Sequence, residues 1–134
     1  DEVSCQLRDD FQKRTGLGLI ERLLSARQYL GSRLLSRIYK ENRFITPCYA
    51  GSLLVVLKEE GSVYPCEMLN LKMGNLKDFD FNLKKLWFSK QAQKVRQTIK
   101  KSKCFCTYEC AMTLNTLFNP RHALTILKDA LKRK

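Results

Sequence analysis

Apolar residues recur at every third or fourth position in the stretch LGLIERLLSARQYLGSRLLSRIYKENR, residues 17–43. This spacing predicts an amphipathic helix, because it places the apolar side chains on one face. Gly31 lies inside the pattern and is the point at which we expect the helix to divide in two, since glycine weakens helices. The apolar positions are Ile20, Leu23, Leu24, Leu30, Leu34, Leu35 and Ile38.

The pattern then changes to that of a β-hairpin. Residues 53–57, LLVVL, form an apolar run of the length of one buried strand, and residues 63–68 predict the returning strand. The turn between them is KEEG, in which Gly61 suits a backbone with positive φ. The pair Gly74-Asn75 has turn chemistry, so we expect a loop there.

Helical spacing returns in the C-terminal half. Ser89 can cap a helix over residues 90–101, and a short helix is expected over residues 111–118. The pair Asn119-Pro120 suits the N-cap and first turn of a last helix. Helices around one hairpin predict a small α+β domain.

Composition sets the class of protein. The 134 residues, 44% of them hydrophobic, suffice for one compact domain with its own core. The longest apolar run is far shorter than the roughly 18 residues of a membrane helix, and the acidic, polar N-terminus does not resemble a signal peptide. We therefore expect a cytoplasmic protein with no membrane partner, whose thiols stay reduced.

The chain is strongly basic, with 25 Lys and Arg against 13 Asp and Glu and a net charge of +12. Such a charge favours an anionic partner, nucleic acid among them. No nucleic-acid motif accompanies it, and the lysines at helix ends also suit the negative end of the helix dipole. We therefore expect a solvated basic surface rather than a nucleic-acid partner.

Five of the six cysteines are candidate ligands of a metal site. Cys48 precedes the first strand of the hairpin and Cys66 lies in the second, and because the two strand ends lie side by side, these thiols can meet at the open end of the hairpin. Cys104, Cys106 and Cys110 fall within seven residues, CFCTYEC, which we expect to form a loop able to fold around one ion or cluster. Two thiolates from the hairpin and two from this cysteine knuckle would make a four-sulfur site.

Several other interpretations compete with a four-sulfur metal cluster. Disulfides are disfavoured in a reducing compartment, and three cysteines so close together, flanked by lysines, are too dense for simple core packing. Zinc and iron–sulfur clusters both accept four thiolates. Cys-x2-Cys pairs, typical of zinc ribbons, are missing, which favours iron–sulfur; a zinc-stabilised basic binding module stays as the alternative.

The residues around the cysteines resemble a known family. The segments CYAG, EEGSVYPCEML and MGNLKDFDFNLKKLWFS, followed by the knuckle, are similar to the SPASM/twitch auxiliary-cluster domain of radical S-adenosylmethionine enzymes. That family begins with Cys, nine to fifteen residues, Gly, four residues and Cys; Cys48, Gly61 and Cys66 match it with twelve and four intervening residues. The resemblance covers residues 45–119.

The departures from the family pattern are informative. A full SPASM domain has Cys-x2-Cys-x5-Cys-x3-Cys and a distal cysteine, and here only Cys106-x3-Cys110 matches the end of that run. Five thiols cannot fully ligate two four-iron clusters, which need eight, so the resemblance implies a single-cluster, twitch-like domain. Cys104 and Cys106 compete for the fourth ligand position, and Cys5 is expected to be unrelated.

The resemblance implies an arrangement of domains and a function. Residues 1–44 would be a helical connector from an upstream radical S-adenosylmethionine barrel of the same polypeptide, and residues 45–134 the cluster domain. The cluster domain would bind one [4Fe-4S] cluster, which transfers an electron or braces the fold during modification of a peptide or protein.

The sequence also lacks the motif that binds the S-adenosylmethionine cluster, Cys-x3-Cys-x2-Cys. Cys106-x3-Cys110 begins that spacing, but residue 113 is Thr. S-adenosylmethionine would therefore bind only upstream, and we expect this chain alone to hold no catalytic residue and no activity.

Overall fold

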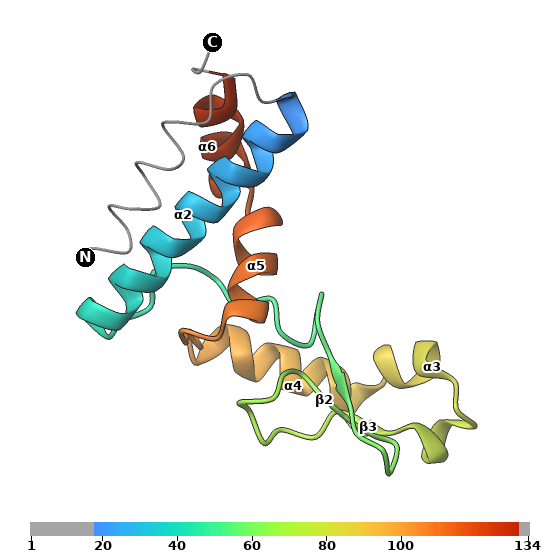
Figure 1. Ribbon diagram of the computed structural model, residues 1–134. Coiled ribbons are helices and arrows are strands. Elements are labelled where there is room, and N and C mark those ends of the chain that lie inside the picture. The colour runs from blue at the N-terminus through green and yellow to red at the C-terminus, as the bar shows by residue number, and fades with distance from the viewer. Residues whose placement is uncertain (1–17, 132–134) are drawn as a thin grey trace. The chain divides into compact units, whose positions relative to one another are not determined.

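The computed structural model describes residues 18–131 (Figure 1). These residues divide into two compact units: one comprises residues 18–45 and 106–131, and the other comprises Thr46–Phe105. The described part contains five α-helices and a three-stranded antiparallel sheet, which confirms the predicted α+β class. Cys5 and the end of the predicted last helix at Lys132 lie outside the described residues.

The first unit is built on one long helix, α2, Leu19–Glu41. It runs without interruption through Gly31, so the expected break there is wrong. A single glycine lowers helix stability, but packing on both sides of it offsets that loss. The helix ends at Asn42, whose left-handed backbone lets its N–H bond to the carbonyl of Ile38 at 2.9 Å.

Two further helices, α5, Glu109–Leu117, and α6, Pro120–Leu131, pack against α2 (Figure 1). Asn119 precedes α6, and its side-chain oxygen accepts a hydrogen bond of 3.0 Å from the N–H of Arg121, so the predicted start of this helix is confirmed. The buried residues form two clusters along α2: Ala26 with Ile126 and Ala130, and Leu34 and Ile38 with Met112.

The second unit contains the sheet, in the order β1, β2, β3. The predicted hairpin is confirmed by β1, Val56–Leu57, and β2, Ser62–Tyr64, joined at Gly61 with φ of 89°. Both strands are shorter than expected, because β1 begins only at Val56 and β2 stops before Pro65. The pair expected to lie in a loop is instead a third strand, β3, Gly74–Asn75, paired with β2.

A 3-10 turn, Leu76–Phe79, and two helices, α3, Leu83–Trp87, and α4, Lys90–Lys101, complete this unit. The hydroxyl oxygen of Ser89 accepts a hydrogen bond of 3.2 Å from the N–H of Ala92, so the predicted cap of α4 is confirmed. The core joins the sheet to α3 and α4 through Ala50, Val63, Cys66, Met73, Leu86, Ala92, Val95 and Ile99.

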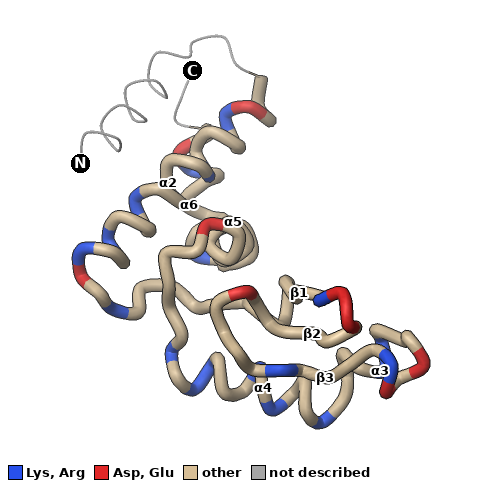
Figure 2. The backbone as a smooth tube through the Cα atoms, turned by 60° about the horizontal axis from the view of Figure 1, so that its bottom comes forward, with Lys and Arg blue, Asp and Glu red and all other residues tan. Residues whose placement is uncertain are grey.

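Basic residues gather on α4, which carries five Lys and Arg and no acidic residue (Figure 2). Four of them are exposed lysines: Lys90, Lys94, Lys100 and Lys101. None of the helices described above combines the length and the apolar character that crossing a membrane requires.

Candidate metal centre

Cys66 is the most buried of the candidate ligands, with 6% of its surface exposed. It was expected within the second strand, but β2 ends at Tyr64 and Cys66 follows the fully buried Pro65. Proline cannot donate a ladder hydrogen bond, which explains why the strand stops there. Cys66 is therefore held by a rigid, buried segment rather than by the sheet ladder.

The loop that follows Cys48 is tied to the segment that precedes Cys66. The N–H of Gly51 points at the carbonyl oxygens of Leu54, at 2.7 Å, and Pro65, at 3.2 Å. Gly51 has φ of 75°, and a Cβ placed there would lie 3.1 Å from Cβ of Pro65. Both the backbone conformation and the close approach require glycine, so this residue fixes how near the two cysteine-bearing segments come.

Arg96 on α4 holds the same loop from the other side. Its guanidinium donates one hydrogen bond to the carbonyl oxygen of Gly51 at 3.1 Å and another to that of Trp87 at 2.6 Å. It also lies over the indole of Trp87, 5.4 Å from the ring centre. One side chain thus joins the Cys48 loop, α3 and α4.

Cys104 follows α4 after a change of chain direction. Lys103 adopts a left-handed backbone with φ of 50°, and the N–H of Cys104 bonds back to the carbonyl of Ile99 at 3.2 Å. Cys104 and Cys48 are both partly buried and pack against the core cluster that contains Cys66. Three of the predicted ligands therefore share one core in the second unit.

The other two predicted ligands belong to the first unit, whose second segment begins at Cys106. Cys106 is half-buried and Cys110 is exposed. Cys110 was expected in a loop, but α5 already begins at Glu109, so Cys110 lies in the first turn of a helix.

The donor set fits an iron–sulfur cluster in kind and in number. The five cysteines within residues 18–131 are thiols rather than disulfides, and four thiolates complete a four-iron cluster. Within residues 18–131, no three Cys, His, Asp or Glu side chains are grouped so as to hold a metal ion. The described residues thus supply suitable ligands without a preformed cage.

An open pocket of about 370 Å³ lies beside Cys66. Its walls include β1, β2 and the segment after them, with the ammonium of Lys58 4.6 Å from the ring centre of Tyr64 on one side. Met68, which is 66% exposed, also lines it. The thiol of a predicted ligand therefore lies beside a space that a small molecule or an extended chain can enter.

Sequence reasoning missed the two residues that position the Cys48 loop. Arg96 was counted only within the basic charge, although it stands four residues after Ala92 and three before Ile99, on the buried face of α4. That spacing was the available signal for an arginine that turns inward. Gly51 had no such signal beyond its place in CYAG.

The comparisons with known proteins agree with the cysteine pattern. Residues 48–111 match the family model SPASM, described as an iron-sulfur cluster-binding domain. The matched segment contains all five predicted ligands, and it confirms the resemblance inferred from the sequence. Neither the comparison with curated proteins nor that with solved structures finds a match.

Proposed function

Taking residues 48–111 as a SPASM-type iron–sulfur cluster-binding segment, we propose that it is the auxiliary-cluster domain of a radical S-adenosylmethionine enzyme that modifies a peptide or protein. The family match carries this proposal. The thiol state of the five cysteines and the packing of Cys48, Cys66 and Cys104 about one core support it.

The proposed ligands are Cys48, Cys66 and Cys110, with the fourth supplied by either Cys104 or Cys106. The backbone contacts of Gly51 and the guanidinium of Arg96 hold the segments next to Cys48 and Cys66 in place. The left-handed turn at Lys103 redirects the chain before the knuckle. The fold thus restrains the ligand-bearing segments on the side of the hairpin, while the knuckle supplies the remaining sulfur atoms.

When bound, a four-iron cluster with four cysteine ligands supplies an electron-transfer centre or a structural brace, because it has no open iron for a substrate. The chain's own residues hold the thiolates and govern their exposure to water. The pocket beside Cys66 is the place where we expect part of the peptide or protein substrate to approach. S-adenosylmethionine would be bound upstream.

The test is anaerobic reconstitution of the chain with iron and sulfide, followed by chemical analysis and visible absorbance. We expect a brown protein with about four iron and four sulfide per chain. The variant Cys5→Ser, which removes the cysteine outside the proposed set, is the matched control and should load normally. A colourless protein that retains one zinc ion under the same anaerobic conditions would instead support the zinc-stabilised basic module.

A second measurement addresses the radical chemistry. The isolated chain, incubated with reductant and S-adenosylmethionine, should release no 5′-deoxyadenosine above a control without protein. In the polypeptide with its upstream barrel, Cys48→Ala should leave cofactor cleavage largely intact and abolish product formation. Cofactor cleavage by the isolated chain would place an open-site cluster on these cysteines and contradict the assignment of catalysis to an upstream barrel.

A further inference from the structure

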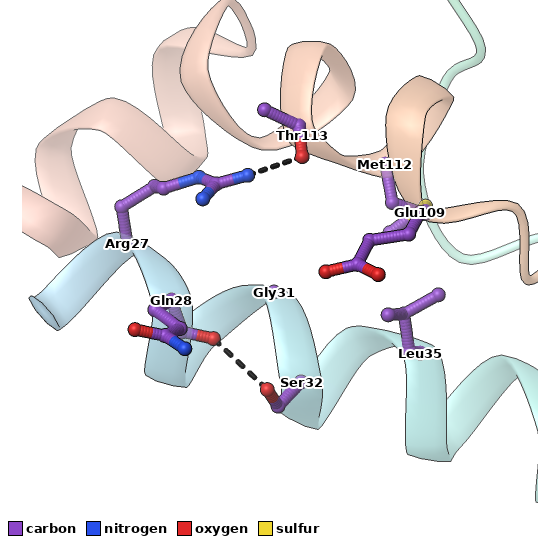
Figure 3. A pocket seen from close by; sticks show the side chains of 8 residues that line it. All are labelled: Arg27, Gln28, Gly31, Ser32, Leu35, Glu109, Met112 and Thr113. Carbon is purple, nitrogen blue, oxygen red and sulfur yellow. Dashed lines mark hydrogen bonds between the residues drawn. The ribbon is translucent and has the colours of Figure 1, made fainter. Parts of the chain in front are cut away.

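A second pocket lies within the helical unit, between α2 and α5, with a volume of about 60 Å³ (Figure 3). No cysteine lines it, so its chemistry is independent of the iron–sulfur cluster. Its walls are largely polar and include an arginine, a glutamate, a serine and a threonine.

The floor of this pocket is the glycine in the middle of α2. Gly31 continues the helix without a break, and a Cβ placed there would meet no atom within 4 Å. Neither an unusual backbone conformation nor close packing therefore requires glycine at this position. Glycine is among the least favourable residues inside a helix, and the absence of a side chain at this position leaves the pocket open.

Arg27 provides an unsatisfied donor in the pocket. One terminal nitrogen of its guanidinium donates a hydrogen bond across to the hydroxyl of Thr113. The Nε atom is buried and has no hydrogen-bond partner within the described residues. A buried N–H of a charged group without an acceptor is costly, so the pocket lacks one acceptor that a ligand can supply. A carboxylate matches the guanidinium, since it accepts two parallel hydrogen bonds.

Glu109, at the first position of α5, provides the complementary group. Figure 3 shows its carboxylate extending into the same space above Gly31 that the guanidinium of Arg27 approaches. Among the described residues, Glu109 and Arg27 form no ion pair with each other or with a third residue. A ligand that satisfies both would present a carboxylate to Arg27 and an N–H donor to Glu109.

We infer that this pocket binds the carboxylate and the neighbouring nitrogen of a single amino-acid residue, either a free amino acid or the C-terminal residue of a peptide. A space of about 60 Å³ has room for those main-chain atoms. Thr113 fixes the guanidinium, whereas the hydroxyl of Ser32 donates to the main-chain carbonyl of Gln28 and takes no part in binding.

The experiment is a titration of the full 134-residue chain, labelled with nitrogen-15, followed through the Nε–H signal of Arg27. The probes are glycine, N-acetylglycine and glycinamide. We expect saturable shifts with at least one of the two carboxylate probes and at least tenfold weaker binding of glycinamide, which has no carboxylate. Equal binding of glycinamide would show that the pocket does not require a carboxylate, and no shift with any probe would leave water as the occupant; either result would overturn the inference.

The two carboxylate probes distinguish the sources of the ligand. Tighter binding of glycine would identify a free amino acid whose ammonium meets Glu109. Equal or tighter binding of N-acetylglycine would identify a peptide C-terminus, in which an uncharged N–H meets the same carboxylate. Either result supports the inference, and Glu109→Gln should weaken the binding of glycine more than that of N-acetylglycine.

Gly31→Leu tests the place of binding, because leucine favours the helix and its side chain would fill the pocket. Binding should weaken at least tenfold in this variant. Arg33→Gln is the matched control, since Arg33 is an exposed arginine on the same helix outside the pocket, and it should bind the probes normally. Unchanged binding in Gly31→Leu would place the ligand elsewhere and contradict the inference.

Discussion

The guanidinium of Arg96 donates a hydrogen bond of 3.1 Å to the carbonyl oxygen of Gly51, a residue 45 positions earlier in the chain. This contact joins the amphipathic helix α4 to the loop that carries Cys48. The N–H of Gly51 already ties this loop to Leu54 and Pro65, and the guanidinium, itself held by Trp87, adds a charged donor from α4.

Replacing Arg96 with alanine should therefore destabilise the second unit. The variant loses two hydrogen bonds from a charged donor and the contact with Trp87, so we expect the free energy of unfolding to fall by about 2–4 kcal/mol. Urea unfolding of the metal-free chain, followed by circular dichroism, measures this change. Lys94→Ala, at an exposed position of the same helix, should change stability by less than about 0.5 kcal/mol. Equal effects of the two substitutions would refute the positioning role of Arg96.

Replacing either of two glycines with alanine should change the stability of the protein, in opposite directions. Gly51→Ala forces a side chain into a backbone with φ of 75° and to 3.1 Å from Pro65, so it should lower stability by about 1–3 kcal/mol. Gly31→Ala lies in a helix with open space around the new Cβ, so it should raise stability by up to about 1 kcal/mol. Thermal unfolding of both variants and of the parent chain measures these two changes in stability. A stabilising Gly51→Ala would show that the close approach to Pro65 is not required.

The ligand set predicts a specific pattern among single Cys→Ala variants. Cys48, Cys66 and Cys110 should each be indispensable for cluster loading, while one of Cys104 and Cys106 should be dispensable, because five thiols serve four iron atoms. The measurement is iron and sulfide per chain after anaerobic reconstitution. Normal loading of the Cys66 variant would remove the most buried thiol from the set and contradict the proposed site.

Cluster binding should also protect the chain against local opening. In the metal-free protein we expect faster hydrogen exchange in residues 45–70 and 102–112 than in the loaded protein, because structural metal sites contribute free energy to folding. The backbone from Leu23 to Ile38 should exchange at the same rate in both, since it packs on α5 and α6. Identical protection of the hairpin in both forms would assign the cluster a redox role without a structural one.

His122 in α6 predicts one pH effect. Burial lowers the pKa of its imidazole below the ordinary value, since desolvation disfavours the charged form. The unfolded chain therefore takes up a proton below about pH 6.5 before the folded chain does, and stability falls as the pH drops through that range. His122→Gln should lose less stability between about pH 7.5 and pH 5.5 than the parent chain. An unchanged pH dependence of the urea midpoint would show that other groups cause the effect.

The sequence predicted the elements whose signals are local. The cap at Ser89, the turn at Gly61 and the start of α6 at Asn119 follow from side-chain chemistry within a few residues, and all three are confirmed. Strand β3 was missed because two residues carry no alternating pattern, and pairing with β2 alone defines it. Local propensity likewise overstated the effect of Gly31, since packing decides whether α2 continues.

The candidate site likewise has a part that the sequence predicted and a part that it did not. The residue types and spacing of the cysteines predicted an iron–sulfur segment, which the family match confirms. The contacts that position the Cys48 loop could not be predicted, because Arg96 and Gly51 meet only through the fold. The polar pocket on α2 was missed for the same reason, since Arg27 and Glu109 stand far apart in the sequence.

The close approach of Gly51 to Pro65 has a consequence for genetics. If every residue were varied in turn and colonies were scored for a brown protein, cysteine codons would not be the only intolerant ones. Gly51 contributes no ligand atom, yet every other amino acid places a carbon 3.1 Å from Pro65 and disturbs the spacing of two cysteine-bearing segments. A map of intolerant codons would therefore outline the scaffold as well as the ligands, and Gly51 would be indistinguishable in such a map from a cysteine that binds iron.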